Sequence, residues 1–311
     1  MVSSIYFTNM KKIFLSALLL CLALNIKAQQ EFHTIMHHFV PQLRQVAYSA
    51  TKEEVNLTLL YCNQWRGIEG NPQNTLFSGH YKIKSGGLAI GAIANQEKCG
   101  IKTNSMAELI FSYGINLKNS LLAFGIGSSY NSMKWDISDL SDEEVRDLAS
   151  LSRTPDCRFL SFRTGLYLCF DNFYFGATVS NLNKFKSNFY TPKPHGYITS
   201  GYKAQLTKKL TLNIEGNVQT ERFTGYAPDI SATLASDEKL FAGLSYRAEK
   251  NIGFHIKVNF SRHLYVGAAY EHAANALRKS HTASTFEFIF GFRQPVKNEP
   301  PASWDNDRLL F

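Results

Sequence analysis

Apolar and polar residues alternate strictly through the stretch "NIGFHIKVNF" at residues 251–260. Its apolar positions include Ile252, Phe254 and Ile256, and the positions between them include His255 and Lys257. A period of two indicates a β-strand with one apolar face and one polar face. In a soluble sheet the apolar face points to the core, whereas in a transmembrane barrel it points to lipid. One strand alone fits both arrangements.

The same pattern recurs along most of the chain, as about ten alternating residues followed by a turn. Segments of that length suit a tilted strand that crosses a membrane. The predicted strands are 54–65, 74–84, 87–96, 103–115, 119–133, 158–170, 172–182, 195–206, 208–219, 225–235, 239–248, 251–261, 263–273 and 282–293. Their number is even, as in bacterial outer-membrane barrels.

The polar faces of these strands carry charged residues well inside the segments. They are Glu108, Arg163, Glu215, Arg247, Lys257, Glu271 and Glu287. In a soluble sandwich these residues would form the solvated face. The connections favour the barrel, because the odd-numbered ones are mostly long and the even-numbered ones short. The long connections are 66–73, 133–157 and 183–194, and the short ones include 117–120, 206–209 and 236–239.

The N-terminus has the pattern of a secretory signal, with translation starting at Met10. Lys11 and Lys12 precede an apolar run at 13–26, and Ala28 marks a plausible cleavage point. An exported chain without a later run of 18 apolar residues remains a membrane protein only as a barrel. The net charge of +8 is scattered rather than clustered, which argues against a nucleic-acid partner.

The predicted fold is therefore an all-β, transmembrane antiparallel β-barrel of about 14 strands in the outer membrane of a Gram-negative cell. The predicted organisation is a signal peptide at 1–28, a periplasmic or plug segment at 29–53, the barrel at 54–293 and a periplasmic tail at 294–311. Gly125 and Gly127 lie mid-strand, where glycine thins the barrel wall.

Three segments resemble the PorP/SprF family of the type IX secretion and gliding machinery of Bacteroidota. They are "LLYCNQWRGIEGNPQN" in the first strand and loop, "DNFYFGATVSNLNK" in mid-barrel, and the closing strands from "LFAGLSYRAEKNIGF" to Glu287. The chain departs from the family at "VPQLRQVAYSA" and at the Tyr270–Glu271 pair. The resemblance implies a non-enzymatic protein without catalytic or cofactor residues. It also implies a role in linking secreted cargo to the periplasmic secretion apparatus.

Two long connections supply candidate cargo contacts, since exposed aromatic side chains are favoured interface anchors. The connection 183–194 offers Phe185, Phe189 and Tyr190. In 133–157, Ser141 and Glu144 form a capping box for a short helix whose apolar stripe includes Leu148 and Leu151. The alternative for that helix is closure of the barrel mouth.

Cysteine and histidine residues give two further expectations. An oxidising compartment favours a disulfide between Cys99 and Cys157, with Cys62 as a competitor. His33, His37 and His38 lie close together, but no third ligand is near them in sequence apart from Glu31. We therefore predict no metal site and no cofactor, and interpret this stretch as a polar N-terminal segment.

Other functional classes remain as alternatives. An outer-membrane channel for small or hydrophobic molecules is the first, because fourteen strands enclose a lumen. A soluble adhesive sandwich is the second. A lipid hydrolase would need neighbouring Ser and His on the outer wall, and no such pair is evident. The expected partners are periplasmic components of the secretion apparatus, a secreted cargo protein and outer-membrane lipid.

Overall fold

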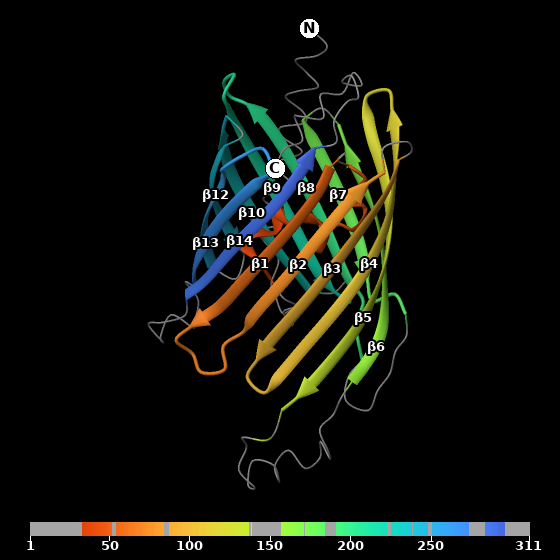
Figure 1. Cartoon of the computed structure of the whole chain (residues 1–311), viewed down its shortest axis with the longest axis vertical. Helices are drawn as coiled ribbons and strands as arrows, with labels where there is room; N and C mark the ends of the chain where they lie inside the picture. The colour runs from red at the N-terminus through yellow and green to blue at the C-terminus, as the bar shows by residue number, and fades with distance from the viewer. Residues whose placement is uncertain are drawn as a thin grey trace.

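The chain forms a closed antiparallel barrel in which each strand pairs with its sequence neighbours and the last strand pairs with the first (Figure 1). The computed structural model describes residues 33–51, 54–83, 87–136, 138, 157–170, 172, 173–183, 191–222, 225–237, 239–247, 251–273 and 284–295. The predicted signal peptide at 1–28 and the tail from 296 onward lie outside these residues. No helix in the described part is long and apolar enough to cross a membrane.

All fourteen predicted strands are present among the described residues, so the prediction from alternation is confirmed. They are β1 (Glu54–Arg66), β2 (Gln73–Lys82), β3 (Leu88–Cys99), β4 (Lys102–Leu117), β5 (Ser120–Trp135), β6 (Cys157–Cys169), β7 (Phe173–Ser180), β8 (His195–Gln205), β9 (Leu210–Glu221), β10 (Gly225–Ser236), β11 (Leu240–Arg247), β12 (Asn251–Asn259), β13 (Leu264–Ala273) and β14 (Ser284–Pro295).

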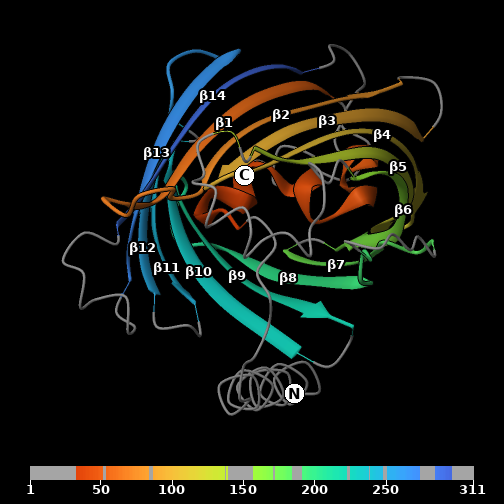
Figure 2. The same ribbon diagram turned by 90° about the horizontal axis from the view of Figure 1, so that it is seen from below.

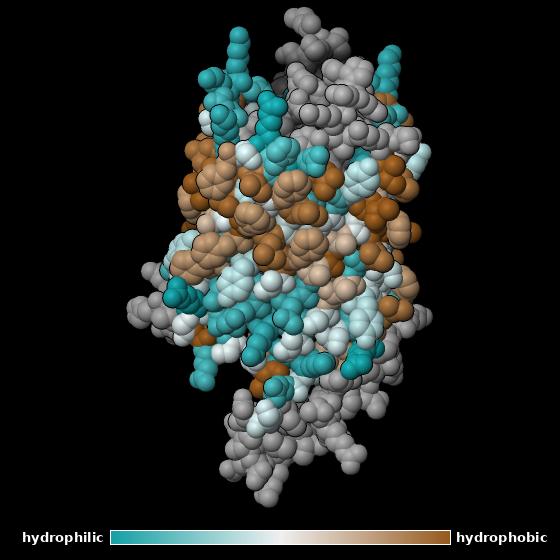
Figure 3. Space-filling model, viewed as in Figure 1, coloured by the Kyte–Doolittle hydropathy of each residue, from teal (hydrophilic) through white to brown (hydrophobic). Residues whose placement is uncertain are grey.

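The alternation in β12 settles which way the apolar faces point. Phe254 is 48% exposed on the outside of the barrel, whereas its neighbour His255 is 0% exposed and faces the lumen. The other strands follow the same rule, which produces an apolar band around the visible wall with hydrophilic residues at both ends (Figure 3). A continuous band of this kind matches the hydrocarbon layer of a membrane.

The two ends of the barrel differ in their connections. One end, here called the loop end, carries the connections 67–72, 100–101, 136–156, 181–194, 222–224, 248–250 and 274–283. The opposite turn end carries no connection longer than five residues, and every connection of six or more lies at the loop end. The turn-end connections are 83–87, 118–119, 170–172, 206–209, 237–239 and 260–263, and the start of β1 and the end of β14 lie at the same end. In outer-membrane barrels short turns face the periplasm and longer loops face outward.

This asymmetry predicts that the loop end faces the cell exterior. An epitope inserted at residues 137–156 should be reached by antibody on intact cells. The same epitope at 237–239 should be reached only after the outer membrane is permeabilised. Labelling with the opposite pattern would reverse the orientation of the barrel.

Candidate functional site

An N-terminal segment of the chain lies inside the barrel and fills its middle (Figure 2). This segment, here called the plug, covers residues 33–51 and forms three short 3-10 helices. They are η1 (Ile35–Phe39), η2 (Pro41–Leu43) and η3 (Val46–Ala50). The side chain of Thr34 accepts a hydrogen bond from the backbone N–H of Met36 and so caps η1, and Pro41 opens η2 at a position where proline is tolerated.

The first helix of the plug is fixed by a carboxylate of the barrel wall. Glu287 of β14 is only 1% exposed and accepts hydrogen bonds from the Thr34 hydroxyl and from two backbone N–H groups. The distances are 2.6 Å from Thr34 Oγ1, 2.9 Å from Ile35 N and 3.1 Å from Met36 N. A negative charge at a helix N-terminus is favourable, because the free N–H groups there are donors without partners in the helix.

The end of η2 is bound by a positively charged residue of the barrel wall. Arg163 of β6 donates to the carbonyl oxygens of Leu43 at 2.9 Å and Gln42 at 3.0 Å, and it pairs with Glu108 of β4. The wall thus offers a carboxylate to free N–H groups and a guanidinium to free carbonyls. Both charged residues belong to the polar faces recognised in the sequence.

Two plug glutamines extend the attachment to other strands. Gln42 donates to Ser49 of the plug at 2.6 Å and accepts from Ser78 of β2 at 2.7 Å. Gln45 donates to Thr199 of β8 at 2.9 Å and accepts from Thr178 of β7 at 3.1 Å. Amide side chains that use both their donor and their acceptor fix the plug in one orientation.

Apolar packing and glycine complete the fit. One buried cluster joins Ile35, Met36, Phe39, Val40 and Val46 of the plug to wall residues such as Leu60 and Phe241. A second joins Ala47, Tyr48 and Ala50 to residues such as Tyr167 and Tyr174. At Gly125 a Cβ atom would come within 2.7 Å of the backbone of Ala47. The predicted thinning of the wall at Gly125 therefore makes room for the plug backbone.

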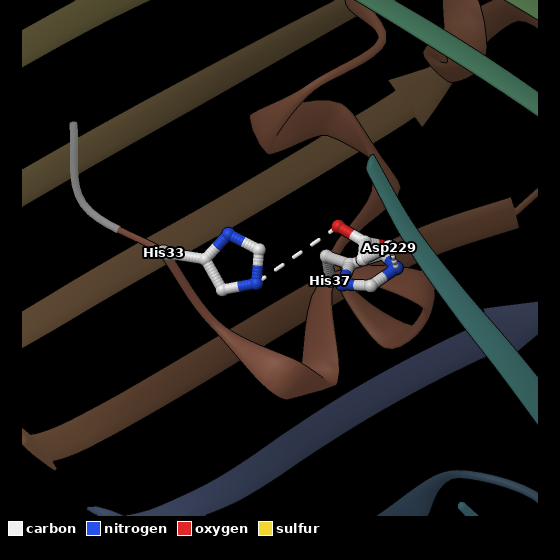
Figure 4. A group of neighbouring side chains, drawn as sticks. All are labelled: His33, His37 and Asp229. Carbon is white, nitrogen blue, oxygen red and sulfur yellow. Dashed lines mark ion pairs between the residues drawn. The ribbon is translucent and has the colours of Figure 1, made fainter. Parts of the chain in front are cut away.

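A polar cluster lies where the plug meets β9 and β10. His33 and His37 of the plug face Asp229 of β10 (Figure 4), at 3.9 Å from His33 Nε2 to Oδ2 and 3.6 Å from His37 Nε2 to Oδ1. Arg44 donates to Asp229 Oδ2 at 3.0 Å. Burial, aided by Arg247 and Arg44, holds the pKa of His33 well below its usual value. His38 lies beside this cluster, and burial likewise lowers its pKa.

An open cavity of about 800 Å³ lies between the plug and the loop end of the barrel. Its floor includes Leu43 and Arg44, and its wall includes Asn95, Asn104, Trp135 and Tyr197. This cavity, here called the vestibule, stops at the plug. The long strands β4 and β5 form part of its wall, because their first and last residues respectively extend to the loop end.

The residues singled out in the sequence have different outcomes. The predicted lumen charges are inside the barrel, including Glu215, Lys257 and Glu271. The candidate cargo contacts Phe185, Phe189, Tyr190, Leu148 and Leu151 all lie outside the described residues, so they stay predictions.

The structure does not support the Cys99–Cys157 disulfide, because both thiols are free. Cys99 ends β3 and Cys157 begins β6, so β4 and β5 lie between them. Three strand spacings amount to about 14 Å. A disulfide needs Cα atoms closer than about 7 Å. The error came from treating closeness in strand order as closeness in space.

The plug itself is the site that sequence reasoning identified only in outline. Its backbone and side chains are bound by wall residues more than a hundred positions away, such as Arg163 and Thr199. The sequence did offer one signal: charged residues on the lumen faces of the strands, and glutamines in the N-terminal segment, all need hydrogen-bond partners inside the barrel.

A closed antiparallel barrel with an apolar outer band and a plugged polar lumen defines the class of outer-membrane β-barrel proteins. The chain belongs to the PorP/SprF family, because the model of that family, described as type IX secretion system membrane protein PorP/SprF, matches residues 39–292. The protein is therefore located in the cell outer membrane. Neither its family nor its fold is a known enzyme class. The match begins within the plug.

A structural comparison finds solved outer-membrane proteins among the matches to this chain. The toluene transporter TbuX of Ralstonia pickettii is 9% identical with a TM-score of 0.51, covering 82% of this chain and 93% of that chain. The Pseudomonas putida toluene transporter TodX is 9% identical with a TM-score of 0.49, covering 87% and 96%. Omp33 of Acinetobacter baumannii is 14% identical with a TM-score of 0.47, covering 78% and 97%. At 9% identity the likeness to TbuX shows the fold alone. No curated protein matches the chain.

Proposed function

We propose that this protein is a non-enzymatic anchor of the type IX secretion machinery, which holds secreted cargo at its loop end and periplasmic components at its turn end. The observation that carries the proposal is the plug. Residues 33–51 are bound to strands around the lumen by hydrogen bonds, ion pairs and apolar contacts. A lumen filled in this way suits a scaffold better than a conduit.

The loop end is the proposed cargo surface. The vestibule opens there and combines aromatic residues, such as Trp135 and Tyr197, with asparagines, such as Asn95 and Asn104. Its charges are of both signs and include the pairs Glu108–Arg163 and Lys193–Glu221. A surface that carries charges of both signs and is rich in amides and aromatic rings suits a polypeptide partner. The connections 137–156 and 184–190 would add the predicted contacts around its rim.

The turn end is the proposed contact with the periplasmic apparatus. The start of β1 and the end of β14 lie together there, paired through Glu54 and Pro295. Both flanking segments, the plug and the tail after Pro295, therefore leave the barrel wall at the same place. The tail sequence "VKNEPPASWDNDRLLF" is polar and rich in proline, a composition that favours an extended chain.

Deleting residues 296–311 should leave the barrel folded and weaken its recovery with periplasmic partners. The barrel is expected to survive because the deletion begins after β14 ends. Folding is checked by heat-modifiable migration on a gel, and partners are counted by mass spectrometry after pull-down from detergent-solubilised outer membranes. Replacing 296–311 with a glycine–serine segment of equal length is the matched control for chain length. Recovery of every partner by the deletion protein would remove the tail from the model.

A channel for small or hydrophobic molecules is the second candidate, and the vestibule is the observation that favours it. The vestibule already opens one half of the barrel, so passage would require only displacement of the plug. Conductance in planar bilayers separates the two functions, because an open pore conducts and a plugged scaffold does not.

A further inference from the structure

Four side chains converge on one point between the plug and the wall. His37 Nε2 lies 3.1 Å from Glu215 Oε1 of β9 and 3.6 Å from Asp229 Oδ1 of β10. Asn217 Nδ2, also of β9, lies 2.9 Å from His37 Nε2, 2.9 Å from Glu215 Oε1 and 3.1 Å from Asp229 Oδ1. Ligand atoms about 2.0–2.1 Å from a tetrahedral zinc ion are separated by about 3.3 Å, close to these distances.

Each of these side chains also forms a hydrogen bond through its second polar atom, on the side away from the shared point. His37 Nδ1 lies 3.0 Å from the carbonyl oxygen of Thr34. The Tyr174 hydroxyl donates to Glu215 Oε2 at 2.5 Å, Arg44 donates to Asp229 Oδ2, and Thr199 donates to Asn217 Oδ1 at 2.6 Å. Outer partners of this kind orient the ligands of a metal site and leave the inner atoms free to face the ion.

Three of the four inner atoms share one donor group when His37 carries its proton on Nδ1. With a proton on Nδ1 directed at the Thr34 carbonyl, His37 Nε2 is an acceptor, and so are the inner oxygens of Glu215 and Asp229. One NH2 group, that of Asn217, faces all three and has only two hydrogens. The Asn217 amide offers its oxygen to a cation at this point when it turns over, because the two amide orientations occupy the same space; Thr199 Oγ1 then accepts from its NH2 group instead of donating to its oxygen.

Charge gives the same result. Glu215 and Asp229 are both buried, and Arg44 pairs with Asp229. Two carboxylates and one guanidinium therefore meet in this cluster. Buried charges are stable only when they are paired or bound to a metal. A divalent cation held between Glu215 and Asp229 meets this requirement.

We propose that His37, Glu215, Asp229 and Asn217 bind one divalent transition-metal ion of the zinc class. Imidazole nitrogen combined with carboxylate oxygen suits zinc or cobalt, and the four side chains include no soft thiolate that would select copper(I). His33 is the candidate for a further position, because one ligand atom each of His33, His37 and Asp229 lie within 4.8 Å of one another (Figure 4). The ion ties His37 of the plug to β9 and β10 of the wall.

This inference departs from the expectation, based on sequence spacing, that the histidines lack further ligands. The acidic ligands come from β9 and β10, and only the folded barrel brings them to the plug. The inference stands on the geometry of the cluster and does not depend on the proposed function.

The test is cobalt and zinc binding by the full chain, purified in detergent and stripped with a chelator. Cobalt(II) should bind at one ion per chain with the visible absorption of a low-symmetry site, and zinc should displace it. Loss of an outer-sphere partner typically weakens metal binding by about 10–100-fold, so His37→Gln and Glu215→Gln, which remove ligands, should weaken it by at least about 100-fold. His263→Gln, in the exposed 260–263 turn, is the control for adventitious histidine binding and should leave it unchanged.

Heat-modifiable migration shows whether each variant assembles. Glu215→Gln keeps an oxygen for the Tyr174 hydroxyl and serves as the decisive variant if His37→Gln does not fold. The proposal is overturned if the unmodified chain binds neither ion. It is equally overturned if the folded Glu215→Gln protein binds as tightly as the unmodified chain.

Discussion

Replacing Phe288 by lysine should leave most of the protein unable to assemble as a folded barrel. Phe288 is 53% exposed on the outer face of β14 and points to lipid. A lysine near the bilayer midplane costs about 2–4 kcal/mol, which is a large share of the marginal stability of a protein. The measurement is the fraction of protein in outer membranes that shows the faster migration of an unheated barrel.

Two substitutions serve as controls for this result. Phe288→Leu keeps the apolar surface and should assemble normally. Thr285→Lys lies on the lumen face of the same strand, where Lys257 of β12 shows that a lysine is accommodated. Equal losses for Phe288→Lys and Thr285→Lys would contradict the assignment of the two faces.

Replacing Glu287 by leucine should release the plug while leaving the barrel closed. The change removes the acceptor of three hydrogen bonds from Thr34, Ile35 and Met36. Hydrogen bonds to a charged group contribute about 1.5–3 kcal/mol each and are not additive, so the docking of the plug should weaken by at least about 3 kcal/mol. That corresponds to more than about a 100-fold shift toward the undocked plug.

Two measurements report release of the plug. Cys62 is buried in the same cluster as Ile35 and Met36, with its sulfur 3.6 Å from Glu287 Oε1, so it should become reactive to maleimide. Cys157 packs with Met133 and Phe159 away from the plug and should not change. The variant should also conduct ions in planar bilayers, where the unmodified protein is expected to stay silent.

The matched control is Glu271→Leu. Glu271 pairs with Arg247 at 3.0 Å, so this change breaks an ion pair between two wall residues. It should leave Cys62 protected and the bilayer silent. Similar conductance for both variants would mean that the plug is not what closes the lumen.

The strands could be predicted from the sequence because contact with lipid on one face requires alternation of apolar and polar residues. Some strand ends were predicted wrongly, because the strands continue beyond the part that contacts lipid. The third and fourth strands, predicted at 87–96 and 103–115, extend to Cys99 and Leu117, and β4 begins at Lys102. Near the loop end the backbone ladder continues through Glu97–Asn104 and Lys98–Thr103, although the apolar alternation has ended. The strands there remain hydrogen-bonded beyond the last apolar residue of the alternating pattern, because both of their faces meet water.

The predicted start of the ninth strand was wrong because a turn continues further than expected. The ninth strand was predicted from 208 but begins at Leu210. The hydroxyl of Thr207 accepts from the N–H groups of Lys209 and Leu210, which extends the turn by two residues. Threonine side chains often bond to backbone groups two or three residues ahead, a local competition with strand pairing that periodicity does not detect.

The conformation of the plug could not be predicted from the sequence for a different reason. Its helices are short 3-10 turns without an amphipathic period, and their backbone ends are satisfied by Glu287 and Arg163 rather than by neighbours in sequence. The metal cluster has the same origin, since its ligands come from three separate parts of the chain. Contacts of this kind exist only once the barrel has closed.

The attachment of the plug to Glu287 links the two ends of the chain during biogenesis. Thr34 and Glu287 are separated by 253 positions, and Glu287 lies opposite Cys62 at the seam where β14 meets β1. Contacts between such distant residues form late, because the loop between them has to close first. Glu287 therefore serves two late events, because its backbone joins the seam between β14 and β1 and its side chain holds the N-terminal segment. Docking of that segment is thus expected to accompany closure of the wall.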